Sequence, residues 1–153
     1  MMNVRDLKQA LPPRHSILGF DYGEKRLGLA VSDLLLMTAN PLPIINRKSF
    51  EQDLMQIQKV IAEKEVGALV YGLPLQMDGT EGATAAAARE FAAKIAEHIQ
   101  LPYLFWDERL SSKAVETFLI REVDMSRAKR KQILDSSAAC YILQGVLDAV
   151  RYL

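Results

Sequence analysis

The stretch that most constrains the fold spans residues 17–33 and reads ILGFDYGEKRLGLAVSD. Five of its first six residues are apolar or glycine, and such a nearly unbroken apolar run is typical of a central strand that is buried on both faces. Residues 23–25 predict a tight turn and residues 26–32 a second strand, so the two strands should form a hairpin. The exception in the apolar run is Asp21, whose carboxylate would cost several kcal/mol to bury without a partner.

Strand and helix patterns alternate along the rest of the chain. Residues 41–46 predict a short third strand at a sheet edge, because their prolines cannot donate to a ladder. Ser49, followed by Gln52 three residues later, predicts the start of a helix that Gly67 helps to end. Strands over residues 68–73 and 101–106 then alternate with helices over residues 83–99, about 111–120, and a last segment that reaches the C-terminus. This order predicts an α/β fold with a five-stranded mixed sheet flanked by helices on both faces.

The length of 153 residues suits one domain. We expect an N-terminal arm over residues 1–16, in which Pro12 and Pro13 prevent regular structure, and a single domain over residues 17–153. The N-terminus lacks the apolar segment of a signal peptide, and no apolar run is long enough to cross a membrane. The single cysteine, Cys140, excludes an internal disulfide and a thiolate metal cage. These features predict a cytoplasmic protein with no membrane partner, and they leave a homodimer open.

Three carboxylates stand where a site could form. Asp21 ends the first strand, and Glu108 follows the last strand on the face of Trp106. Asp135 lies in the final helix, where its neighbours on the same face include the small residue Ala139. In sheets of this kind, sites form where strands end and the chain order switches.

Three converging carboxylates repel one another unless a cation neutralises them. Oxygen-only ligands suit Mg²⁺ or Mn²⁺, ions that activate water and stabilise phosphoryl transfer. Each residue also has an ordinary interpretation: Asp21 can accept backbone hydrogen bonds in a turn, Glu108 can pair with Arg109, and Asp135 with Lys131. Periodicity alone leaves both interpretations open.

The chain resembles the YqgF family, also called RuvX, in four blocks that occur in the family's order and spacing. These blocks are DYGEKRLGLAVSD, YGLPLQMDGTEG, DERLSS and DSSAACYILQGVLD, and the resemblance runs from Ile17 to Ala149. The family has a ribonuclease H-like fold, and its members are described as Holliday junction resolvases and as nucleases that mature the 5′ end of pre-16S ribosomal RNA. The resemblance implies a divalent-metal-dependent endonuclease, with Asp21, Glu108 and Asp135 as catalytic residues and ligands of Mg²⁺ or Mn²⁺.

For such an enzyme we expect two ions, with Asp21 bridging them because it lies on the central strand. The natural substrate would be pre-16S rRNA, and a branched DNA junction is the alternative. A non-catalytic nucleic-acid-binding factor and a nucleotide-binding ATPase or sugar kinase are further hypotheses. The kinase hypothesis rests on the Asp-x-Gly hairpin, although the chain is short for two domains that close around ATP.

Basic residues near these carboxylates are the candidates for binding nucleic acid. Net charge is zero, so a polyanionic partner must meet a local cluster of cations. The candidates next to the acidic residues, and those that precede Asp135 in the chain, are Lys25, Arg26, Arg109, Arg127, Lys129, Arg130 and Lys131. An ordinary hairpin tip and a solvated helix face are the alternatives for these residues.

Overall fold

The computed structural model describes residues 2–107 and 127–153, and side chains are described for residues 2–107 and 138–153. Its strands are β1 (Ser16–Asp21), β2 (Arg26–Ser32), β3 (Ala39–Asn46), β4 (Val66–Leu73) and β5 (Tyr103–Asp107). Its helices, within the described residues, are α1 (Val4–Ala10), α2 (Phe50–Glu63), α3 (Ala83–Ala96) and α5 (Arg127–Arg151). None of these helices combines the length and the apolar character needed to cross a membrane.

The five strands form one mixed sheet in the order β3-β2-β1-β4-β5. Strand β1 pairs antiparallel with β2 and parallel with β4, while β3 is antiparallel to β2 and β5 is parallel to β4. The predicted five-stranded mixed sheet, the central position of β1 and the edge position of the proline-containing β3 are therefore confirmed. A central β1 follows from its apolar run, because only a strand flanked on both sides buries both of its faces.

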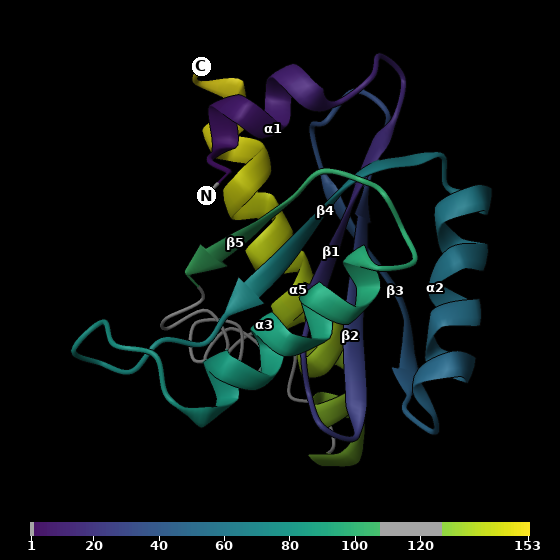
Figure 1. Cartoon of the computed structure of the whole chain (residues 1–153), viewed down its shortest axis with the longest axis vertical. Coiled ribbons are helices and arrows are strands. Elements are labelled where there is room, and N and C mark those ends of the chain that lie inside the picture. Colours follow the sequence, from purple (N-terminus) through teal and green to yellow (C-terminus); the bar gives the residue numbers. More distant parts are fainter. Residues whose placement is uncertain (1, 108–126) are drawn as a thin grey trace.

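Helices cover both faces of the sheet, as Figure 1 shows. On one face, Ile17 of β1 belongs to an apolar cluster with residues of α5. On the other face, Leu18 and Phe20 pack in a second cluster that includes Ile57 of α2 and Phe91 of α3. Side chains that alternate along β1 thus separate an α5 side from an α2–α3 side.

The expectation that the N-terminal arm lacks regular structure is wrong, because residues 4–10 form helix α1. Asn3 caps this helix: its Oδ1 accepts from the Asp6 backbone N–H at 2.9 Å, and the Asp6 carboxylate accepts from the Asn3 N–H at 3.2 Å. The two prolines lie beyond the C-cap residue Leu11, where they cannot interrupt the helix. Leu7 is fully buried in the cluster on the α5 side, so α1 contributes to the core.

The predicted start of α2 is confirmed, but its predicted end is wrong. Ser49 Oγ accepts from the Gln52 N–H at 3.2 Å, as an N-cap should. Gly67 already belongs to β4, and the residue that turns the chain after the helix is Glu65, with φ of 53°. A non-glycine residue in the left-handed region costs some free energy, which a sequence pattern does not reveal.

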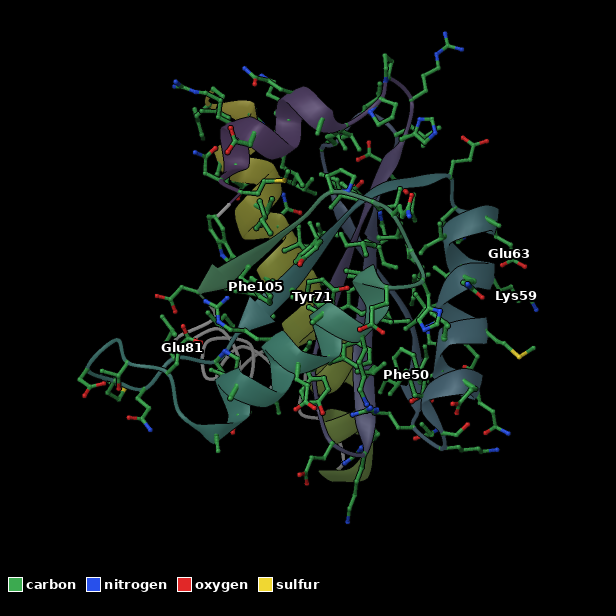
Figure 2. All side chains as sticks on the ribbon, in the orientation of Figure 1. Phe50, Lys59, Glu63, Tyr71, Glu81 and Phe105 are labelled. Carbon is green, nitrogen blue, oxygen red and sulfur yellow. The ribbon has the colours of Figure 1, made fainter. Side chains whose placement is uncertain are left out.

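The aromatic cluster that packs against α3 contains one buried hydroxyl group, that of Tyr71, which should lower the free energy of unfolding. Tyr71, labelled in Figure 2, is 1% exposed. Its ring stacks on that of Phe20, with the ring centroids 4.9 Å apart. Among the described residues, nothing forms a hydrogen bond with its hydroxyl group. Burial, with a smaller effect from Tyr103, raises the pKa of this hydroxyl above its ordinary value.

Tyr71→Phe should therefore raise the free energy of unfolding by about 1 kcal/mol, because the variant no longer buries an unsatisfied polar group. Urea denaturation at neutral pH measures the change. The partly buried Tyr103 provides the control, since Tyr103→Phe should give no comparable gain. A clear loss of stability in Tyr71→Phe would mean that the hydroxyl is satisfied in solution.

Candidate active site

Asp21 is the last residue of the central strand and lies on the α5 side of the sheet. It is half-buried and pairs with Gly28 of β2. The side chain shares a face with Ile17 and Gly19, because residues two apart in a strand point the same way. Ile17 packs with α5, so the Asp21 carboxylate is directed toward the side of the sheet that this helix covers.

Gly19 brings α5 unusually close to the strand that carries Asp21. A Cβ atom on Gly19 would lie 3.0 Å from the Cβ of Leu143 and 3.5 Å from the carbonyl oxygen of Ala139. The first distance is shorter than ordinary van der Waals contact, so a side chain at position 19 would require its neighbour in α5 to shift. The contact fixes where the helix lies relative to the end of β1.

Helix α5 runs antiparallel to β1 (Figure 1). Near its C-terminus, Arg151 Nη2 donates to the carbonyl oxygen of Met37 at 3.0 Å, in the loop after β2. That loop lies at the start of β1, since the Ile17 N–H donates to Ser32 Oγ at 2.9 Å. The N-terminal turns of α5 therefore extend toward the Asp21 end of the strand.

This direction places the backbone of residue 135 near the Asp21 end of β1. Asp135 precedes Ala139 by four residues, which is one helical turn, and Ala139 is opposite Gly19. Moving from Gly19 to Asp21 along β1 and from Ala139 to Asp135 along α5 leads in the same direction. The Asp135 side chain lies outside the described part of the structure, so its role as a ligand stays a prediction.

The strand that leads to Glu108 ends at the same edge of the sheet. Gly72 of β4 pairs with Trp106 of β5, one position beyond the Phe20–Tyr71 pair that precedes Asp21. Trp106 packs in the cluster on the α5 side, as the alternation along β5 predicts. Glu108 and Arg109 follow Asp107 directly and lie outside the described residues.

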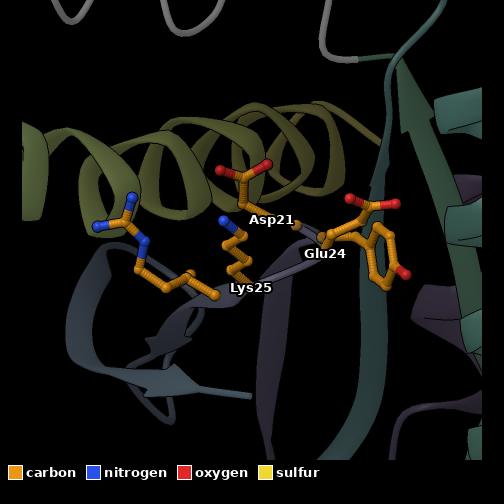
Figure 3. A pocket seen from close by; sticks show the side chains of 7 residues that line it. Asp21, Glu24 and Lys25 are labelled. Carbon is orange, nitrogen blue, oxygen red and sulfur yellow. The ribbon is translucent and has the colours of Figure 1, made fainter. Parts of the chain in front are cut away.

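An open hollow of about 370 Å³ surrounds Asp21 and the turn of the hairpin. Lys25 and Arg26 line it, so the structure brings two of the seven predicted nucleic-acid-binding residues to the candidate catalytic carboxylate (Figure 3). Lys25 is exposed and Arg26 is half-buried. Glu24 lines the same hollow and was not predicted, although its place in the turn between two candidate residues could have indicated it.

The remaining basic candidates are placed only by their backbone. Arg127, Lys129, Arg130 and Lys131 lie in the first turns of α5, the end of the helix that extends toward Asp21. Their side chains, like residue 109, lie outside the described part of the structure. Their contact with nucleic acid stays a prediction.

The donor chemistry at this edge fits a hard divalent cation. Asp21 offers carboxylate oxygens, and neither Gly19 nor Gly28 adds a side chain beside it. Among the described side chains no three His, Cys, Asp or Glu residues are grouped to hold a metal. A complete ligand set therefore depends on the two predicted partners, Glu108 and Asp135.

This chain is similar to known proteins over most of its length. The family model described as "RuvX: Holliday junction resolvase" matches residues 15–149. A protein of Gluconobacter oxydans named "Putative pre-16S rRNA nuclease" is 42% identical over 151 residues, which cover 99% of this chain and 94% of the relative. A protein of the same name from Agrobacterium fabrum is 48% identical over 148 residues, covering 96% and 92% of the two chains.

Two solved structures share the fold at low sequence identity. Thermus thermophilus RuvC in complex with a Holliday junction substrate superposes with a TM-score of 0.57 at 16% identity, covering 90% of this chain and 96% of RuvC. The fowlpox virus resolvase in complex with Holliday junction DNA gives a TM-score of 0.54 at 9% identity, covering 88% and 98%. These similarities confirm the ribonuclease H-like fold that the family resemblance implies.

Proposed function

This chain belongs to the RuvX family, and from that membership we propose that it is a divalent-metal-dependent endonuclease that matures the 5′ end of pre-16S rRNA. The observation that carries the proposal is the position of Asp21, at the end of the central strand and facing α5, within a hollow that Lys25 and Arg26 line together with Glu24. The nuclease domain would span residues 17–153. The enzyme would act in the cytoplasm, and light scattering would test whether it forms a homodimer.

The carboxylates of this chain would bind the metal ions, and its basic residues would bind the phosphate. Two Mg²⁺ or Mn²⁺ ions, when bound, supply an activated water and stabilise the charge that develops on the leaving oxygen. Asp21, Glu108 and Asp135 would be the residues that hold these ions. Lys25 and Arg26 would hold a phosphate beside them through charge-assisted hydrogen bonds.

Resolution of Holliday junctions is the second candidate function. The description of the matching family model favours it, because that description names a Holliday junction resolvase. Both functions hydrolyse a phosphodiester bond, so Asp21 would have the same role in each. The difference lies in the shape of the nucleic acid that reaches the hollow.

Side-by-side incubation distinguishes the two functions. The protein is mixed with 16S precursor RNA that carries its 5′ extension, and separately with four-way DNA junctions, each with Mg²⁺ and with Mn²⁺. We expect cleavage of the RNA at its 5′ side and little cleavage of the junctions. Cleavage of the junctions alone would favour the resolvase, and binding without cleavage of either would favour a non-catalytic factor.

The basic start of α5 gives a prediction about affinity. Changing Lys129 and Arg130 to alanine should weaken binding of all sequences equally and lower the salt slope by roughly one for each phosphate that the variant no longer binds. Fluorescence anisotropy over a range of salt concentrations measures both effects. Lys59→Ala with Lys64→Ala removes the same charge from α2, on the other face of the sheet, and should leave the slope unchanged. Equal slopes in both double variants would mean that Lys129 and Arg130 do not bind phosphates.

A further inference from the structure

The turn that follows Asp21 has little support from the sheet itself. Pairing of β1 with β2 extends to Asp21 and Gly28, and residues 22–25 connect the two strands. Within this turn, a Cβ atom on Gly23 would lie 2.5 Å from the carbonyl oxygen of Arg26, so the turn is tightly folded. The β1–β2 ladder alone does not reach residues 22–25, so contacts from other elements contribute to the shape of this turn.

Arg47 contacts the turn at three points. Its backbone N–H donates to the carbonyl oxygen of Lys25 at 2.9 Å. Its Nη1 donates to the carbonyl oxygen of Gly23 at 3.1 Å and to the Tyr22 hydroxyl at 3.0 Å. The first bond joins main-chain atoms and continues the β2–β3 ladder beyond the Arg26–Asn46 pair. The side chain of Arg47, located directly after β3, therefore bonds to two of the four residues that connect Asp21 to β2.

Arg47 is itself fixed by both helices on the α2–α3 side. Its Nε donates to Asp53 Oδ2 at 3.2 Å, and Asp53 is 1% exposed in the first turns of α2. The second carboxylate oxygen of Asp53 accepts from the Lys48 N–H at 3.3 Å. The Arg47 guanidinium also lies 5.0 Å from the centre of the Tyr22 ring and 5.2 Å from that of Phe91 in α3.

A buried ion pair of this kind is weak evidence for stability, because removing both charges from water is costly. Its planar, multiply bonded donor is, however, well suited to fixing geometry. The geometry that it fixes here is the turn attached to the candidate catalytic carboxylate. Arg47 and Asp53 lie on the opposite face of the sheet from α5, so they would act on Asp21 through the turn and without touching substrate.

We propose that Arg47, held by Asp53, is a positioning residue that fixes the turn after Asp21 and thereby the direction of the Asp21 carboxylate. This inference rests on the proposed nuclease function. Residues that orient a metal ligand typically change activity by about 10–100-fold when they are replaced. Arg47 should therefore affect turnover and the Mn²⁺ requirement, while affinity for nucleic acid stays the same.

Arg47→Lys is the principal test variant. It keeps a positive charge beside the buried Asp53, but one ammonium group cannot reach Asp53, Tyr22 and Gly23 together. Arg47→Gln combined with Asp53→Asn removes both charges at once, so no unpaired buried charge remains. Arg89→Lys is the matched control, because Arg89 also pairs with a carboxylate, that of Glu81, and lies 4.6 Å from the Phe105 ring centre.

Two measurements are made on each variant. Hydrogen exchange of the metal-free protein should become several-fold faster in peptides covering residues 21–28, while β4 stays protected. Turnover should fall about 10–100-fold with little change in KM, and more Mn²⁺ should be needed for half-maximal rate. Arg89→Lys should change neither measurement.

The outcomes separate this inference from the proposed function. Unchanged exchange in residues 21–28 would overturn the role of Arg47 in holding the turn. Faster exchange with wild-type turnover and Mn²⁺ dependence would show a purely structural role and also overturn the proposal. If the wild-type protein cleaves neither RNA nor junctions, the proposed function fails, whereas the exchange experiment still decides whether Arg47 fixes the turn.

Discussion

Asp21→Asn should abolish nuclease activity and leave the melting temperature of the metal-free protein unchanged or higher. The carboxylate lies at the end of β1, on the side of the sheet toward which the N-terminal turns of α5 extend. If Glu108 and Asp135 converge on it as proposed, three negative charges repel one another without a metal. Replacing one of them by a neutral amide relieves this repulsion, as expected of a site that sacrifices stability for function.

Two melting curves for each protein test this expectation. With chelator, the variant should melt no lower than the wild type. With Mn²⁺ at about 100 times its Kd, the wild type should gain about 2.7 kcal/mol, and the variant much less. A variant that melts clearly lower without metal, by the equivalent of about 1–3 kcal/mol, and still cleaves RNA would identify Asp21 as a structural acceptor of hydrogen bonds.

Asp33 provides the matched control because its carboxylate is such an acceptor. Asp33 Oδ1 accepts from the backbone N–H groups of Met37 at 2.7 Å and Thr38 at 3.0 Å. Burial acts to raise the pKa of Asp33, but these donors outweigh it and hold the pKa below its ordinary value. Its contribution to stability is thus present at neutral pH and is lost as the pH falls through the folded-state pKa. Asp33→Asn should lower the melting temperature at neutral pH and leave activity intact.

The sequence was sufficient to predict the sheet because burial determines it. A strand with an apolar run such as residues 17–22 can bury both of its faces only at the centre of a sheet. Prolines such as Pro41 are accommodated in a strand at the edge of the sheet. The alternation of side chains along each strand then places Asp21 and Trp106 on the same face of the sheet. These inferences need only the local sequence and the two-residue period of a strand.

The contacts of Arg47 could not be predicted in this way. Arg47 and Gly23 are 24 residues apart, and they meet only because β3 returns alongside β2. Nothing in the local sequence around Arg47 distinguishes it from a solvated residue at a strand end. Helix α1 is a different case, since Asn3 and Asp6 form a capping box that is visible in the sequence, while Pro12 and Pro13, which predict an irregular arm, lie beyond the end of the helix.

Gly19→Val should lower the free energy of unfolding by about 1–3 kcal/mol, because a side chain at this position is forced against α5. Even the first added carbon would lie 3.0 Å from Leu143 Cβ, and the backbone of the helix is close behind it. The backbone of an α-helix cannot yield as a flexible side chain can. The helix must therefore move away from β1.

This displacement should also reduce activity, by about 100-fold in the fraction that remains folded. Asp21 and Asp135 lie on the two elements that Gly19 holds together, and a displacement near 1 Å is enough to cost about two orders of magnitude in rate. Urea denaturation measures the stability, and turnover is measured well below the melting temperature. Gly19→Ala should give smaller changes in the same directions.

Gly67→Val separates the loss of stability from the loss of geometry. A Cβ atom on Gly67 would lie 2.8 Å from His15 Cβ, so the variant is also overpacked, but this residue lies near the start of β4, at the opposite end of the sheet from Asp21. It should be destabilised and should keep its activity while it is folded. If Gly19→Val also keeps full turnover at low temperature, the distance between β1 and α5 does not control the reaction. Asp135 would then have no part in the site.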